Sequence, residues 1–217
     1  MITEAGLMTL RLTILSFLIA TSIAIPIGVI AAVKRYSWFD YGSMFGSTLG
    51  VAVPNYWIGL MAIVIFSVQL GWVPPYGADS WQAYILPVTV LAIEEMAALA
   101  RLTRGATIEV LGQDYVTTGR AKGLADLTVI VRHVVRNALL PVVTLIGYRI
   151  AFILSGTIVV ETVFAWPGLG RLFYDSITSQ DFQVVQAIVI LLTVLVVVMN
   201  IVTDLTYAVI DPRVRVR

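Results

Sequence analysis

The sequence predicts an all-α protein built as a polytopic bundle of membrane helices. Of its 217 residues, 59% are hydrophobic and 12% are charged, and the mean hydropathy is +0.93. Soluble domains carry about 25% charged residues, so this composition indicates a chain that lies in a lipid bilayer. Long apolar runs and the uneven placement of the cations are the two other observations that predict this fold class.

Five apolar runs are long enough to cross the hydrocarbon core as helices. The first run is longer than the apolar part of a signal peptide and lacks its small-residue cleavage pattern, so we interpret it as a span. Pro54 is expected to kink or start a helix rather than to contact a ligand. Together the spans predict one membrane domain over residues 1–217, with spans at residues 12–33, 48–70, 84–102, 138–160 and 184–208.

Lysine and arginine are distributed unevenly between the two sets of loops. The loops after the second and fourth spans contain one cation, Arg171, whereas the other loops and the C-terminal tail contain ten. Cytoplasmic loops carry an excess of lysine and arginine, so the cation-rich segments are predicted to be cytoplasmic and the N-terminus external. An odd number of spans after so short a lead indicates that a helix precedes this chain. The ten cations are Lys34, Arg35, Arg104, Arg120, Lys122, Arg132, Arg136, Arg213, Arg215 and Arg217.

The composition argues against several classes of function. Fourteen basic against thirteen acidic residues give a net charge of +1, so there is no basic field for nucleic acid. With no cysteine and one histidine, His133, a metal site is not expected. The sequence has no GxxxxGK[ST] phosphate loop and no HExxH. We therefore expect no catalytic residue, no metal ligand and no ATP site in this chain.

Residues 105–136, which we call the elbow, are too polar to lie in lipid and too regular for a disordered linker. Residues 115–121 can form about two helical turns, and Gly123 suits a left-handed helix end. Asp126 is expected to cap a second helix that continues into the fourth span. A solvated connector whose cations face anionic lipid head groups is one interpretation. A docking element for a cytoplasmic partner is the other.

The elbow resembles the cytoplasmic coupling loop of permeases from binding-protein-dependent ABC importers. Gly123 takes the place of the invariant glycine of that family, and residues 117–119 stand where its E-A-A triplet would be. The triplet differs, but GQDYVTTGRAKGL and RHVVRNALLPV are similar to the oligopeptide/dipeptide subfamily, which usually has alanine in place of Gly119. The resemblance implies that the ATPase-coupling residues are Thr117, Thr118, Gly119, Ala121, Lys122, Gly123 and Leu124.

Four further stretches look like members of the same subfamily. They are PNYWIGL at 54–60, LGWVPPYG at 70–77, VVETVFAWPGLGRL at 159–172 and YAVIDPRVR from 207. Trp166 in the third stretch suits a membrane-interface belt before a short interfacial helix, or else an external gate or platform for a binding protein. The family has a first transmembrane helix that this chain lacks, so we expect either a fragment or a gene start placed at an internal Met.

The resemblance implies a type I ABC importer permease fold and a set of partners. These are two cytoplasmic ATPase subunits that use ATP, a second permease subunit of different sequence, an extracytoplasmic substrate-binding protein and the lipid bilayer. The chain would lie in the cytoplasmic membrane of a bacterium or archaeon and translocate peptides or a related small solute by alternating access. The chain itself would not be an enzyme and would bind no cofactor, because the partner subunits hydrolyse the ATP. A channel-like or scaffold subunit without ATP-coupled transport is the alternative.

Three ionisable residues are predicted to lie inside the membrane, where each costs about 3 kcal/mol on insertion scales. Glu94 and Glu95 fall near the middle of the third span, and Arg149 falls near the middle of the fourth. Adjacent residues diverge by about 100° around a helix. Our hypothesis is that one glutamate pairs with Arg149 while the other lines the solute path and holds a peptide's terminal amine. The alternative is a structural ion pair plus a glutamate packed against the partner permease.

Overall fold

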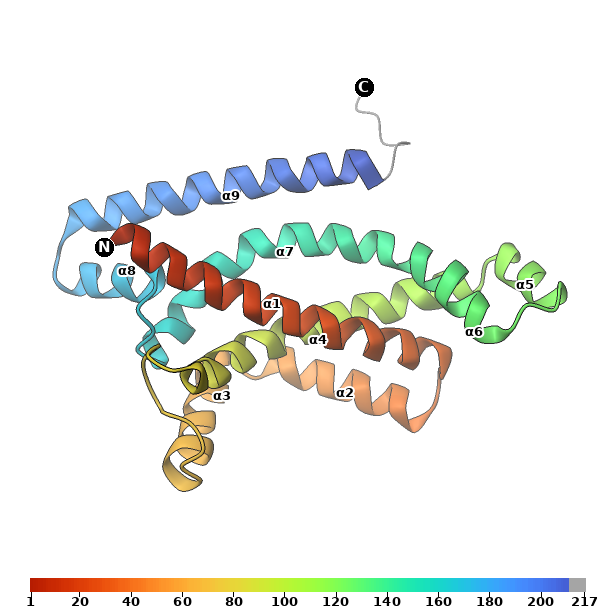
Figure 1. Cartoon of the computed structure of the whole chain (residues 1–217), viewed down its shortest axis with the longest axis horizontal. Helices are drawn as coiled ribbons and strands as arrows, with labels where there is room; N and C mark the ends of the chain where they lie inside the picture. The colour runs from red at the N-terminus through yellow and green to blue at the C-terminus, as the bar shows by residue number, and fades with distance from the viewer. Residues whose placement is uncertain (211–217) are drawn as a thin grey trace.

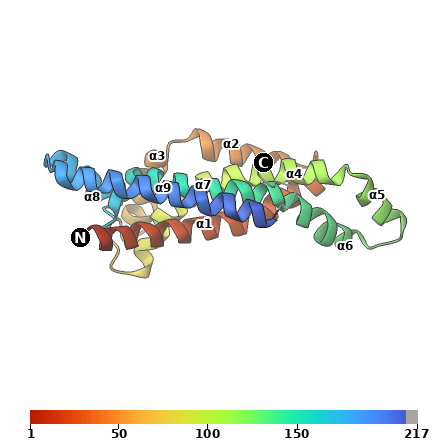
Figure 2. The ribbon, with the colours of Figure 1, turned by 90° about the horizontal axis from the view of Figure 1, so that it is seen from above.

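A computed structural model describes the backbone of residues 1–210 and the side chains of residues 1–143, 157–198, 200 and 201. Within this part, four long helices run along the longest axis of the molecule (Figure 1), and Figure 2 shows the same bundle from above. α4 packs between α1 and α7, and α9 packs on α7. The long helices are α1 (Ile2–Val33), α4 (Ile85–Leu111), α7 (Arg136–Val163) and α9 (Phe182–Ile210).

Four of the five predicted spans coincide with single helices. The helix Ile2–Val33 and the continuous helix Trp81–Leu111 are long and apolar enough to cross a membrane, and they contain the expected spans 12–33 and 84–102. α7 has 28 residues and α9 has 29, and they contain the spans 138–160 and 184–208. At 1.5 Å per residue each is about 42 Å long, which exceeds a hydrocarbon core of about 30 Å.

The predicted span over 48–70 is divided into two helical segments that meet at a sharp bend. α2 (Trp38–Ala52) ends before Pro54, and the following helices, α3 (Asn55–Ala62) and η1 (Ile63–Gln69), leave at 99° to it. Pro54 has extended backbone angles, φ −61° and ψ 136°, and is the residue before the first turn of α3. Proline lacks the N–H that an interior helical position needs, so the helix stops there and a new one starts. The prediction that Pro54 starts a helix is confirmed.

Small residues bring α1 close to α4. Ala20, Ala24 and Ala31 of α1 have no exposed surface. A Cβ added to Gly28 would lie 2.6 Å from Cβ of Thr103 and 2.7 Å from the carbonyl oxygen of Ala100. Membrane helices associate through such small residues because lipid supplies no hydrophobic force to hold them together. Gly28 therefore fixes the distance between the two helices.

The bundle has two structurally different ends (Figure 1). One end, which we call the α8 end, holds the start of α1, the segment 70–84 with η2 (Trp81–Tyr84), and α8 (Leu169–Thr178). The other, the elbow end, holds the α1–α2 turn and the helices of the elbow. These are α5 (Asp114–Ala121), α6 (Asp126–Thr128) and η3 (Val129–Val135). The two sets of loops that differ in cation content thus lie at opposite ends of the described chain.

Candidate functional site: the elbow and the intramembrane carboxylates

The chain reverses after α5 through a left-handed glycine. Gly123 has φ +79°. Its N–H donates to the carbonyl of Arg120 at 2.9 Å, and the N–H of Leu124 donates to the carbonyl of Gly119 at 3.4 Å. This pair of hydrogen bonds is the Schellman arrangement that ends many helices. The predicted helix over 115–121 and its left-handed terminator are therefore confirmed, with α5 beginning at Asp114.

The elbow has a small core of its own. Val116 of α5 and Val129 and Val134 of η3 are buried together, and Val110 and Leu111 at the end of α4 pack against them. α6, η3 and α7 follow one another without a break. The part of the elbow between α4 and α7, residues 112–135, is thus an ordered unit that projects beyond the long helices (Figure 1).

The residues that the resemblance assigns to ATPase coupling lie at the surface of the elbow. Gly119 is half-buried and the other six are exposed, namely Thr117, Thr118, Ala121, Lys122, Gly123 and Leu124. Apolar side chains also project from this surface, since Leu124 is 42% exposed and Leu127 is 73% exposed. The elbow therefore presents a mixed polar and apolar surface that a second protein can contact.

Residues 105–111 of the elbow continue α4 to its end at Leu111, because an apolar-to-polar change in composition does not interrupt backbone hydrogen bonds. One detail of the predicted elbow is wrong. Asp126 does not cap the second helix, since the preceding Ala125 occupies the cap position. The Asp126 carboxylate instead forms an ion pair with Nε of Arg120 at 3.1 Å. This pair connects the two halves of the elbow across the Gly123 turn.

Two of the three ionisable residues predicted inside the membrane have described side chains. Glu94 is half-buried and accepts a hydrogen bond from Nδ2 of Asn55, the first residue of α3. Glu95 is buried, with 7% of its surface exposed. The side chain of Arg149 lies outside the described residues, so its pairing with a glutamate stays a prediction. Asn55 was not singled out in the sequence, and it ties α4 to the helix that follows the 99° bend.

Trp166 is an internal anchor at the α8 end, so its expected place in an interface belt is wrong. The residue has no exposed surface. Its indole Nε1–H donates to the carbonyl of Met8 at 3.2 Å. Its ring packs edge to face on that of Tyr84, with 4.5 Å between the ring centroids. A tryptophan can be buried in this way because its one polar group has found a partner. α8 does follow directly, as a short helix beginning at Leu169.

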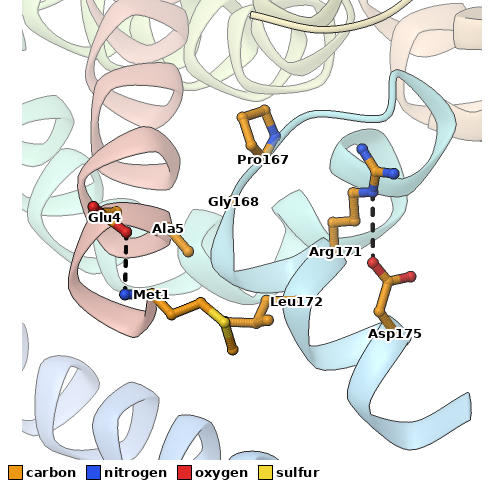
Figure 3. Close-up of a pocket in the computed structure, with 8 residues that line it drawn as sticks. All are labelled: Met1, Glu4, Ala5, Pro167, Gly168, Arg171, Leu172 and Asp175. Atoms are coloured by element: carbon orange, nitrogen blue, oxygen red, sulfur yellow. Dashed lines mark ion pairs between the residues drawn. The ribbon is translucent and has the colours of Figure 1, made fainter. Parts of the chain in front are cut away.

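A pocket of about 330 Å³ opens between the start of α1 and α8 (Figure 3). Nε of Arg171 pairs with Asp175 at 3.6 Å on one side, and the Met1 amine pairs with Glu4 at 3.1 Å on the other. Both pairs are well exposed to solvent. Among the residues that the structure describes, no three His, Asp or Glu side chains are grouped so that they could hold a metal ion.

Proteins of similar sequence show which family this chain resembles. The family described as "Binding-protein-dependent transport system inner membrane component" matches residues 24–216. The chain is 44% identical over 216 residues to the oligopeptide transport system permease protein AppB of Bacillus subtilis (strain 168), covering 95% of this chain and 68% of AppB. It is 45% identical over 207 residues to the glutathione transport system permease protein GsiC of Escherichia coli (strain K12), with the same two coverages.

A solved structure shows the same fold. The chain superposes on the inward-facing MetNI methionine ABC transporter with a TM-score of 0.80 at 17% identity, covering 96% of this chain and 95% of that one. At this identity the likeness concerns the fold, which is the helical fold of type I ABC importer permeases. The matched family pattern covers most of the chain, and the two permeases above are similar over 95% of it. The chain therefore belongs to the family of binding-protein-dependent transport system inner membrane components, the permease subunits of ABC importers.

Proposed function

We propose that this chain is a permease subunit of an ATP-driven importer that carries short peptides or a related small solute across the cytoplasmic membrane. The observation that carries the proposal is the elbow, whose residues 112–135 form an ordered and exposed unit between α4 and α7. The two permeases that are similar to this chain, AppB and GsiC, are named for oligopeptides and for glutathione, which is itself a small peptide. This shared chemistry favours a peptide as the solute.

Energy for transport comes from partner subunits. Two cytoplasmic ATPase subunits bind and hydrolyse ATP, and one of them docks on the exposed surface from Thr117 to Leu124. A partner shifts a conformational equilibrium only when it binds one state better than the other. Because η3 runs into α7 without a break, an ATPase that holds the elbow in one position also favours one position of α7. This is the physical basis of alternating access in our proposal.

Two further partners complete the importer. A second permease subunit of different sequence packs beside this one in the membrane, and a substrate-binding protein delivers the solute at the α8 end. The cation-rich elbow end then faces the cytoplasm of a bacterium or archaeon, as the preference of lysine and arginine for cytoplasmic loops requires. The described cations support this orientation, since Lys34 and Lys122 lie in turns of the elbow end and Arg120 lies in α5.

Glu94 is the carboxylate that we assign to the solute path. Its half-exposed position and its place beside the break between α2 and α3 support this assignment, whereas Glu95 is buried inside the bundle. A carboxylate at this depth can hold the terminal amine of a peptide through a charge-assisted hydrogen bond. Glu95 is then the glutamate that pairs with Arg149.

Reconstitution tests the proposal. The chain, its partner permease and the ATPases are placed in proteoliposomes, and a binding protein loaded with labelled dipeptide, oligopeptide or glutathione is added. We expect uptake that requires ATP, together with ATP hydrolysis that the loaded binding protein stimulates. Solute flux that continues without ATP would identify a channel. A complex that binds no ATPase would identify a scaffold.

A further inference from the structure

A carboxylate from α7 caps the first turn of α8. Glu161 has no exposed surface, and its Oε2 accepts hydrogen bonds from the N–H groups of Gly170 at 2.7 Å and Arg171 at 3.2 Å. Thr157 adds a side-chain hydrogen bond to the same carboxylate. The first amides of a helix have no partner within the helix, and a negative charge is favourable at this terminus. Gly168, the cap residue, has no side chain for this role, so Glu161 supplies it.

One hydroxyl joins this cap to α1. Oγ1 of Thr9 donates to Oε1 of Glu161 at 2.6 Å and accepts from the N–H of Leu169, the first residue of α8, at 2.8 Å. Thr9 is 1% exposed, so water does not compete for these bonds. Three helices therefore meet at two side chains, and Thr9 lies 152 residues from Glu161 in the sequence.

The two glycines of the turn before α8 are explained by this contact. A Cβ added to Gly168 would overlap the carboxylate of Glu161. A Cβ added to Gly170 would overlap the backbone of Ile158 in α7. Both glycines are thus needed for close approach, since neither has a positive φ. The PGLG stretch fits around the buried carboxylate.

α7 connects this cap to the opposite end of the molecule (Figure 1). The helix starts at Arg136, directly after η3 of the elbow, and ends at Val163, two residues beyond Glu161. A displacement of α7 therefore acts on the first turn of α8 through the Glu161 carboxylate. The same displacement acts on α1 through Thr9.

We propose that Glu161 and Thr9 are positioning residues of the transport cycle, forming a latch that makes α8 move together with α1 and α7. Through this latch, movement at the elbow reaches the α8 end as the displacement of one unit rather than of three separate helices. The transport role of the latch rests on the proposed function, whereas its holding of α8 is a property of the permease itself.

A distance measurement tests whether the latch holds α8. Spin labels are placed on Leu7→Cys in α1 and Ile177→Cys in α8, two exposed positions in a chain without cysteine. With Glu161 and Thr9 intact we expect one narrow distance distribution in the lipid-embedded complex. Thr9→Val, which has the same shape without the hydroxyl, should broaden it, and Thr9→Ser should not. An unchanged distribution in both Thr9→Val and Glu161→Met would overturn the proposal.

A coupling measurement tests whether the latch serves transport. The Glu161→Met complex should still hydrolyse ATP, while the solute carried per ATP falls about tenfold, the order expected when a hydrogen bond to a charged group is lost. Glu161→Gln, which keeps one accepting oxygen, should lose less. Loss of hydrolysis and uptake together, in proportion to the amount of complex, would show a structural role and overturn the proposal. If Glu161→Met does not assemble, Thr9→Val against Thr9→Ser decides the same question.

The two proposals fail in different ways. A complex with intact Glu161 and Thr9 that imports nothing with ATP contradicts the proposed function, while the Leu7–Ile177 distance still decides whether the latch holds α8. The latch is contradicted in another way. The unchanged complex imports normally, and Thr9→Val and Glu161→Met alter neither the solute carried per ATP nor the α1–α8 distance.

Discussion

The Asp40 carboxylate accepts two hydrogen bonds from the Arg104 guanidinium and so joins the first turn of α2 to α4. The Nη2–Oδ2 distance is 2.8 Å, and the Asp40 side chain is 2% exposed against 23% for Arg104. Asp40 also accepts from the N–H of Tyr36 at 3.0 Å. Two-pronged pairs of this kind fix geometry as well as charge. The pair therefore fixes the α1–α2 turn against α4 at the elbow end.

Removing Arg104 alone should cost more stability than removing both partners of this pair. Arg104→Gln leaves the buried Asp40 without its counter-charge, and we expect a loss of about 3–5 kcal/mol of stability. Asp40→Asn should cost less, because Arg104 is partly exposed and can reach water. The melting temperatures of the purified complexes check this order. Strictly additive effects in the double variant would show that the two residues are not coupled.

The orientation of the bundle can be read by labelling single cysteines. Asp79 and Lys122 are both exposed. Their segments, 70–84 and the elbow, lie at opposite ends of the molecule. A membrane-impermeant maleimide added to intact cells should label Asp79→Cys, whereas Lys122→Cys should react after permeabilisation. The native chain has no cysteine, so it serves as the unlabelled control. The reverse pattern would refute the predicted topology.

Gly123→Val should uncouple transport from ATP hydrolysis or prevent ATPase docking while the chain still inserts into the membrane. At φ +79° a side chain costs about 1–2 kcal/mol in backbone strain, and an added Cβ would meet no described heavy atom within 4 Å. The effect is thus one of backbone conformation rather than of a clash. Gly123→Asn is the matched control, because asparagine tolerates this region. Normal co-purification with the ATPases and normal transport by Gly123→Val would show that the elbow is not the coupling element.

Gly119→Ala should stabilise α5 by up to about 1 kcal/mol, since glycine is a poor helix former. An added Cβ at Gly119 would lie 3.8 Å from both Leu124 and Val129, which is ordinary contact. Hydrogen exchange of the α5 amides in the complex measures this gain. Gly123→Ala is the contrasting variant, and its left-handed backbone predicts faster exchange there. Slower exchange in both variants would mean that the φ of Gly123 does not matter.

Glu94→Gln should leave assembly intact but weaken uptake. The glutamine oxygen can still accept from Asn55, so the bond across the bend is kept while the charge is lost. Asn55→Ala removes that bond and keeps the charge, so it separates the two roles. Uptake of labelled peptide per assembled complex is the measurement. Uptake that is unchanged in Glu94→Gln would exclude Glu94 from the solute path.

Local rules in the sequence determined much of this architecture. Residues 12–33, 84–102, 138–160 and 184–208 are helical because lipid forces each segment to satisfy its own backbone hydrogen bonds. The left-handed turn at Gly123 depends on one residue type, and it was predicted for the same reason that it forms. Consecutive spans run in opposite directions, so alternate loops lie at the same end of the bundle. The order of the spans therefore also placed the described cation-rich loops at one end.

The tertiary structure decided what depends on distant partners. Residues 48–70 are mostly apolar on both sides of Pro54, so hydropathy did not indicate the direction of the 99° bend before Asn55. Glu161 and Thr9 are 152 residues apart, and no local pattern marks one as the partner of the other. The sequence suggested an interface position for Trp166, but in the fold its indole N–H bonds the carbonyl of Met8 and its ring packs on Tyr84. The physical reason is that lipid is as apolar as a protein core, so composition shows that a helix lies in the membrane but not which of its faces meets another helix.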